Sequence, residues 1–168
     1  MKLPLLLAAL VTALLASGCG QKESSTAPGA SPMAAKPAAA AGARTVEITA
    51  ADNMKFSVAS IDAKPGEELK IVLTNIGTLP KEAMGHNWVL LKKGADANSF
   101  ATAAMTAKDT DYIPAALKDQ VIAYTQLLGP RKSDEVTFKA PTEPGEYVFL
   151  CSFLGHYLAG MKGVLVVK

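Results

Sequence analysis

The feature that most constrains the fold is a series of short apolar runs that begins at Thr45 and continues to the C-terminus. In several runs, such as 45–49 and 69–74, apolar and polar residues alternate with a period of two, as along a half-buried β-strand. Gly, Pro, Asp and Asn residues separate the runs, and Pro65-Gly66 supplies one such turn. Short strands with regular turns predict an all-β sandwich.

The runs predict seven or eight strands with one helical insertion. They cover residues 45–49, 56–61, 69–74, 86–91, 121–125, 134–139, 147–151 and 163–167. The run that starts at His86 is almost continuously apolar, which is typical of a central strand. Residues 98–108 place apolar side chains at helical spacing, so we expect a short helix that packs as a flap outside the sandwich. Because of Pro114, the sequence does not decide whether a second helical turn follows it.

The segment before the sandwich has a different composition. A lysine near the N-terminus precedes an apolar run over residues 5–15, which is typical of a secretory signal and short for a membrane span. Ala16-Ser-Gly-Cys19 is similar to a lipobox, at which the signal is removed and Cys19 is bonded to lipid. We predict a lipoprotein signal peptide over residues 1–18 and a lipid anchor at Cys19. The alternative is an ordinary signal peptide cleaved near Cys19.

Residues 19–43 are rich in Ala, Ser, Pro and Gly and contain no aromatic residue. Such a segment buries too little apolar surface to offset the entropy of ordering, so we predict a flexible tether before a domain over residues 44–168. The protein would then be held on a membrane from outside the cytoplasm, in the bacterial periplasm or at the cell surface. The formal net charge of +2 indicates no nucleic-acid partner.

The chain contains two cysteines and two histidines. Because Cys19 belongs to the processing motif, Cys151 is expected to be a single thiol in an oxidising compartment. It begins the motif Cys151-x4-His156-x4-Met161, in which a thiol, an imidazole and a thioether recur at equal steps. Such soft ligands select copper, and one Cys with two His and a weak axial Met forms an electron-transfer copper site. His86 is the only other histidine that could supply the second imidazole.

Two alternative interpretations of this motif compete with a copper site. Taken singly, a buried Cys, a Met and a His near a loop are more often structural than metal-binding. Zinc also binds one Cys with two His, but it gains little from a thioether, and structural zinc sites commonly take their cysteines in CxxC pairs. The even spacing and the exported single thiol therefore favour copper.

Two segments of the chain resemble azurin and the auracyanins, type I blue copper proteins of the cupredoxin family. They are Met84-Gly-His-Asn-Trp-Val-Leu and Cys151-x4-His156-x4-Met161-Lys-Gly, and the resemblance extends over roughly residues 45–168. It implies a Greek-key sandwich around one copper ion that alternates between Cu(I) and Cu(II).

The resemblance also implies a role for each motif residue. His86, Cys151 and His156 would be equatorial copper ligands, and Met161 would be a weak axial ligand. The backbone carbonyl of Gly85 would face the ion from the opposite side.

Further residues would surround these ligands. The resemblance implies that Asn87 holds the two ligand segments together and, with the amide of Phe153, helps to donate hydrogen bonds to the Cys151 sulfur. The edge of His156 would lie nearest to solvent, inside an apolar rim that docks redox partners. This docking rim consists of Met84, Leu154, Tyr157 and Leu158.

The chain departs from the azurin pattern at four places. It has no cysteine for the disulfide that azurins generally carry, and Asn75 stands near the place of a further His in many azurins. Leu154 replaces a common Pro, and Tyr157 is bulkier than is usual after the ligand His. These differences leave the implied ligand set intact and bear on potential, stability and docking.

The sequence thus predicts a monomeric one-electron carrier that serves redox proteins such as cytochromes or membrane oxidoreductase complexes. An enzyme with a second copper site would need further histidines, so we do not expect catalysis. The alternative function is a periplasmic copper-binding lipoprotein for storage or delivery. Delivery sites are usually exposed and rich in Met or His, whereas the six Met of this chain are scattered.

Overall fold

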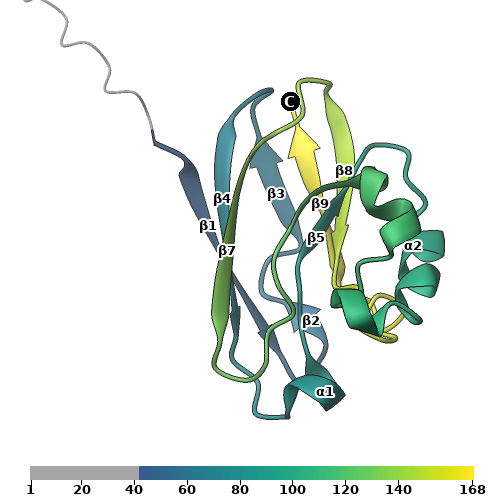
Figure 1. Cartoon of the computed structure of the whole chain (residues 1–168). Coiled ribbons are helices and arrows are strands. Elements are labelled where there is room, and N and C mark those ends of the chain that lie inside the picture. Colours follow the sequence, from purple (N-terminus) through teal and green to yellow (C-terminus); the bar gives the residue numbers. More distant parts are fainter. Residues whose placement is uncertain (1–41) are drawn as a thin grey trace, which may run out of the picture. The chain divides into compact units, whose positions relative to one another are not determined.

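Two β-sheets lie face to face in the part of the chain that the structure describes, residues 42–168 of a computed structural model (Figure 1). The predicted signal peptide, the lipid anchor at Cys19 and nearly all of the tether lie outside the described residues. No helix within residues 42–168 is both long and apolar enough to cross a membrane.

The first sheet has the strand order β2-β1-β4-β7, and the second has the order β3-β9-β8-β5-β6. The pairs β1–β4 and β3–β9 are parallel, and the remaining pairs are antiparallel. The strands are β1 (Arg44–Ala51), β2 (Lys55–Phe56), β3 (Ser60–Ala63), β4 (Glu68–Asn75), β5 (Val89–Leu91), β6 (Val121–Tyr124), β7 (Ser133–Lys139), β8 (Gly145–Leu150) and β9 (Lys162–Val167). The predicted all-β sandwich is confirmed.

One predicted strand, residues 56–61, is divided between the two sheets. Its first part is β2, which pairs with β1, and its last part begins β3, which pairs with β9. The inward positions change phase between the two parts, from Phe56 and Val58 to Ile61 and Ala63. A regular strand cannot move its inward-facing side chains by one residue, so the run is broken into two strands. The described residues therefore contain nine strands rather than seven or eight.

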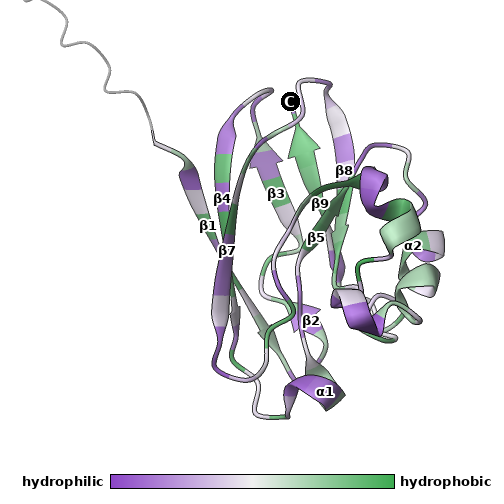
Figure 2. Ribbon diagram, viewed as in Figure 1, coloured by the Kyte–Doolittle hydropathy of each residue, from purple (hydrophilic) through white to green (hydrophobic). Residues whose placement is uncertain are grey.

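Alternating burial builds the core between the sheets. In β4, the side chains of Leu69, Ile71 and Leu73 are fully buried, while the residues between them are partly exposed. Trp88 and Phe149 pack at the centre with their ring centroids 5.5 Å apart. Figure 2 shows hydrophobic segments along β9 and β5.

The continuous apolar run of β5 has a separate cause. All three residues of β5 are buried because α2 (Ala97–Ala104) covers the outer face of the second sheet. Phe100 of α2 belongs to the same buried cluster as Val89 and Leu91. The Asp96 carboxylate caps α2 by accepting from two backbone N–H groups. The predicted helical flap is therefore present, but it ends at Ala104.

The other helical segments lie in the connections. They are α1 (Lys81–Met84), η1 (Lys108–Thr110) and η2 (Ala115–Gln120). No sequence pattern predicted α1. Whether helical residues follow Pro114 was left open, and η2 starts directly after that proline. The predicted strand start at His86 is wrong, because β5 begins at Val89 and His86 forms only an isolated bridge with Leu128.

Candidate metal centre

His86 is held by backbone bonds between two connections at one end of the sandwich. Its N–H donates to the Leu128 carbonyl at 3.1 Å, and the Leu128 N–H donates back to the His86 carbonyl at 2.8 Å. Gly85 before it allows tight packing, because a Cβ there would lie 2.8 Å from the Lys81 carbonyl oxygen. The imidazole of His86 is fully buried.

The second motif forms a loop between β8 and β9. Cys151 follows the last residue of β8, and its N–H donates to the Met161 carbonyl at 3.1 Å. The Met161 N–H in turn donates to the His156 carbonyl at 2.9 Å, so the loop closes on itself. The backbone therefore places these three residues together, and Met161 is fully buried.

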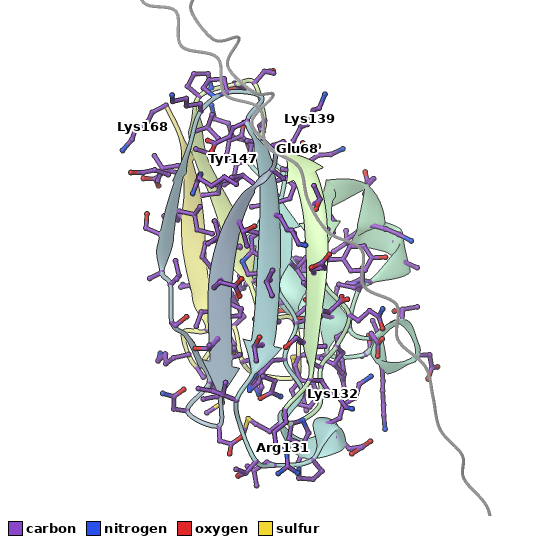
Figure 3. The ribbon with its side chains drawn as sticks, turned by 90° about the vertical axis from the view of Figure 1, so that its left-hand side faces the viewer. Glu68, Arg131, Lys132, Lys139, Tyr147 and Lys168 are labelled. Carbon is purple, nitrogen blue, oxygen red and sulfur yellow. The ribbon has the colours of Figure 1, made fainter. Side chains whose placement is uncertain are left out.

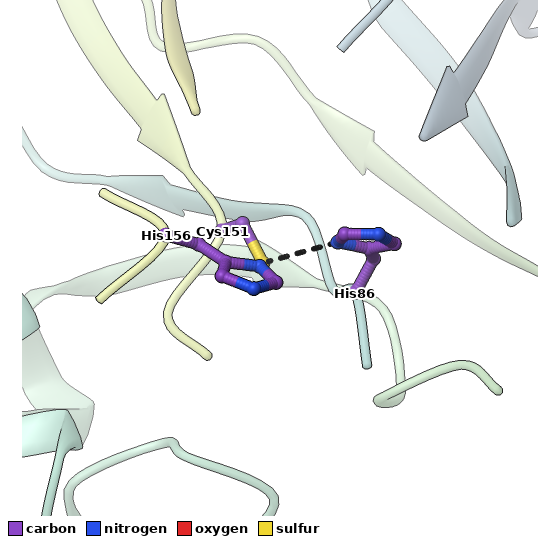
Figure 4. A group of neighbouring side chains, drawn as sticks. All are labelled: His86, Cys151 and His156. Atoms are coloured by element: carbon purple, nitrogen blue, oxygen red, sulfur yellow. Dashed lines mark hydrogen bonds between the residues drawn. The ribbon is translucent and has the colours of Figure 1, made fainter. Parts of the chain in front are cut away.

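The two motifs meet around the sulfur of Cys151 (Figure 4). The Sγ atom of Cys151 lies 4.0 Å from Nδ1 of His86 and 3.4 Å from Nδ1 of His156. The three candidate ligand atoms lie within 4.8 Å of one another, and all three residues are buried. A thiol and two imidazole nitrogens that face one small volume form a donor set for a soft or borderline metal ion.

Burial sets the protonation of this donor set. It lowers the pKa of His86, against the opposing effects of the Asp52 carboxylate and the Ala51 carbonyl. It also lowers the pKa of His156 to about 4, with a further contribution from His86. Both imidazoles are therefore neutral at pH 7, so each can offer a nitrogen lone pair to a metal ion.

The thiol of Cys151 shows the opposite shift. Burial raises its pKa to about 12, and the backbone N–H groups of Asn87 and Phe153 partly oppose that rise. In the apoprotein the thiol is therefore protonated at neutral pH. A metal ion that bound the sulfur would displace this proton and would receive a thiolate already supplied with two N–H donors.

Asn87 joins the two motifs through its side chain. Its Oδ1 accepts from the Ser152 N–H at 2.8 Å, and its Nδ2 donates to the Ser152 hydroxyl at 2.8 Å. Nδ2 also donates to the Asp111 carbonyl at 3.3 Å. Ser152 was not among the predicted site residues, although its hydroxyl directly follows Cys151 in the sequence.

His156, the ligand that the docking rim is predicted to surround, is 3% exposed. Leu154 and Leu158 are 50% and 68% exposed, and Met84 and Tyr157 are half-buried. Phe153 packs below the rim, with its ring centroid 4.8 Å from that of His156.

An exposed methionine of the α2 segment extends this surface. Met105 is 44% exposed and shares a shallow crevice with Tyr157 and Leu158. Met105 was not among the predicted rim residues, because its position relative to the loop depends on how α2 packs.

A buried thiol between two imidazoles, at one end of a two-sheet sandwich, is the arrangement of a type I copper protein. The chain belongs to the plastocyanin/azurin family of copper binding proteins, whose family model matches residues 43–168. The resemblance to azurin and the auracyanins is thereby confirmed, and the cofactor of the chain is copper.

Relatives and solved structures agree with this assignment. Azurin from Pseudomonas chlororaphis is 40% identical over 127 residues, which are 73% of this chain and 97% of that azurin. Auracyanin-B from Chloroflexus aurantiacus is 38% identical over 74% of this chain, and the match spans only 52% of that protein. The crystal structure of dithionite-reduced auracyanin from Roseiflexus castenholzii has a TM-score of 0.67 at 36% identity, covering 76% of this chain and 99% of that one.

Proposed function

We propose that the protein is a one-electron carrier with a single type I copper site formed by His86, Cys151, His156 and Met161. The observation that carries this proposal is the convergence of one buried sulfur and two buried imidazole nitrogens within 4.8 Å. Copper bound there would supply a one-electron couple between Cu(I) and Cu(II). We include the Gly85 carbonyl as a weak further contact.

The role of the protein is to fix these groups before the ion binds. His86 is held by a backbone bridge to Leu128, and Cys151 follows directly on a strand of the second sheet. Side chains held in this way move little when the charge of the site changes, which keeps the reorganisation that accompanies electron transfer small. Complete burial of Cys151 and His86 also excludes water from the sulfur.

Backbone amides tune the sulfur in this proposal. The N–H groups of Asn87 and Phe153 stabilise negative charge on Cys151, as their lowering effect on its pKa indicates. Stabilised thiolate charge favours the reduced state, so these donors are expected to raise the reduction potential. The Asn87 side chain keeps its own segment in register with Ser152.

Electrons would enter and leave through the edge of His156. The exposed leucines of the docking rim, Leu154 and Leu158, offer an apolar surface with no charged side chain on the loop between Cys151 and Met161. A small apolar patch suits brief docking, because a weak redox encounter buries little area. The partners would be redox proteins such as cytochromes or membrane oxidoreductase complexes.

We further propose that a lipid anchor at Cys19 holds the carrier as a monomer at the outer face of a membrane, in the periplasm or at the cell surface. A change of Cys19 to Ala would release it into the soluble fraction, whereas continued retention in the membrane would contradict the anchor. Because both histidines of the chain belong to the copper site, we propose no enzymatic activity.

The decisive experiment compares copper-loaded wild-type protein with Cys151→Ser. The wild type should show intense blue absorption and a reversible one-electron wave in voltammetry, and the serine variant should lose the colour completely because it lacks the thiolate. A blue Cys151→Ser protein would contradict the thiolate assignment. Rapid transfer of copper to an acceptor, without a reversible wave, would instead favour storage or delivery.

A further inference from the structure

The copper loop between Cys151 and Met161 is held mostly by its own backbone. The Ala159 N–H donates to the Gly155 carbonyl at 3.0 Å, and the Gly160 N–H donates to the Tyr157 carbonyl at 2.9 Å. These bonds shape a compact turn, but they do not fix the turn to the rest of the molecule.

One side chain from a distant strand supplies that connection. The ammonium group of Lys55, in β2, donates to the Ala159 carbonyl at 2.8 Å. The two residues are separated by 104 positions. Among residues 42–168, no other hydrogen bond joins the stretch 155–160 to a part of the chain outside 151–162.

The loop sequence leaves room for this ammonium group. A Cβ at Gly160 would lie 2.8 Å from Lys55 Nζ, so a larger residue there would push the lysine away from Ala159. Gly160 also has a φ of +90°, which an L side chain adopts only with strain. The glycine therefore serves both the turn and the approach of Lys55.

A second lysine, Lys162, contacts an aromatic side chain of the same loop. Lys162 Nζ lies 4.7 Å from the centroid of the Tyr157 ring, within the range of a cation–π interaction. Tyr157 is the residue that is bulkier than is usual after the ligand His. This contact fixes the ring within the loop segment, whereas Lys55 fixes the loop to β2.

We propose that Lys55 is a positioning residue of the copper centre, which acts by tying the Ala159 carbonyl to the first sheet. Without this bond, the segment from Gly155 to Gly160 can move as a unit relative to β2. His156 lies within that segment and Met161 follows it directly, so its motion changes their placement relative to Cys151. The proposal rests on the proposed function only for its effect on copper, because the effect on the loop is measured in the apoprotein.

The matched test uses Lys55→Met, which keeps the length of the side chain and removes its donor. Lys55→Arg keeps a cationic donor. Lys139→Met is the control, which removes a different lysine: Lys139 ends β7, and Lys132 lies at the other end of that strand (Figure 3). Hydrogen exchange of the Gly160 and Met161 amides is measured in each apoprotein. Exchange in Lys55→Met should be roughly three- to tenfold faster, the factor expected for losing one hydrogen bond whose charged donor is exposed to solvent.

The second readout is the rate at which a Cu(I) chelator removes copper from the reduced holoprotein. Lys55→Met should release copper faster than wild type, with Lys55→Arg slower than Lys55→Met and Lys139→Met unchanged. Unchanged amide exchange in Lys55→Met, or an equal acceleration in Lys139→Met, would overturn the proposal. Loss of blue absorption in the wild type would refute the proposed function instead, and the exchange result would be unaffected.

Discussion

The two segments that form the copper site are held in different ways. The segment around His86 is bonded on both sides to the connection at Leu128, whose carbonyl also accepts from Asn75 Nδ2 at 3.2 Å. The loop from Cys151 to Met161 is instead bonded chiefly to itself. One half of the site is therefore fixed by the sandwich, and the other half is a local turn attached at few points.

The largest expected effect separates the two histidines. His86→Gly and His156→Gly should each abolish the blue absorption, because each removes an imidazole ligand. Added imidazole should restore most of the colour in His156→Gly, since His156 lies inside the exposed rim of Leu154 and Leu158. His86→Gly should stay colourless because its position is fully buried.

Absorption titrations with imidazole check this difference. The two variants serve as controls for each other, because each keeps one histidine and the cysteine. Equal rescue of both would show that the segment around His86 opens as readily as the loop, and the contrast between the two halves would be wrong.

The next largest effect comes from cutting the link between the halves. Asn87→Ala removes the partners of the Ser152 N–H and hydroxyl, which are buried. Since each buried polar group left without a partner costs about 1–3 kcal/mol, the free energy of unfolding should fall by about 3 kcal/mol. Urea denaturation of the apoprotein measures the loss.

A surface asparagine provides the control for that variant. Asn98 is exposed on α2, so Asn98→Ala should change the free energy of unfolding by no more than about 0.5 kcal/mol. A loss in Asn87→Ala as small as that of Asn98→Ala would mean that the link carries little stability.

The same contrast explains what the sequence could predict. The loop motif was visible because Cys151, His156 and Met161 lie within one turn, where spacing alone limits the geometry. The sandwich was visible from the alternation of apolar residues in strands such as β4. His86 could be assigned to the same site because the chain has only one other histidine and because the segment around His86 resembles that of a known family.

Contacts between distant segments left no pattern in the sequence. The bond from Lys55 to Ala159 joins residues 104 positions apart, and neither residue type indicates the other. The break between β2 and β3 was detectable, because the inward positions change phase between Val58 and Ile61, but residues 56–61 were interpreted as one strand. Packing across the fold brings Lys55 to Ala159, and sequence periodicity carries no information about that contact.

The smallest expected effect is the pH dependence of apoprotein stability. The folded pKa of His156 is lowered to about 4 by burial and by His86, whereas an unfolded histidine titrates near pH 6.5. Below about pH 6.5 the unfolded chain therefore takes up a proton that the folded chain refuses, and stability falls as the pH falls. Between pH 7.5 and 5 the loss through His156 should be about 2 kcal/mol.

Substitution of the two histidines shows which half of the site causes that loss. The pKa of His86 is lowered by burial too, but the Asp52 carboxylate and the Ala51 carbonyl oppose its shift. His156→Gln should therefore flatten the pH profile of urea denaturation more than His86→Gln does. If stability depended on pH more steeply in His156→Gln than in His86→Gln, the larger contribution would come from His86, in the half that the sandwich holds. A histidine that the fold keeps neutral makes stability fall as the pH falls through this range.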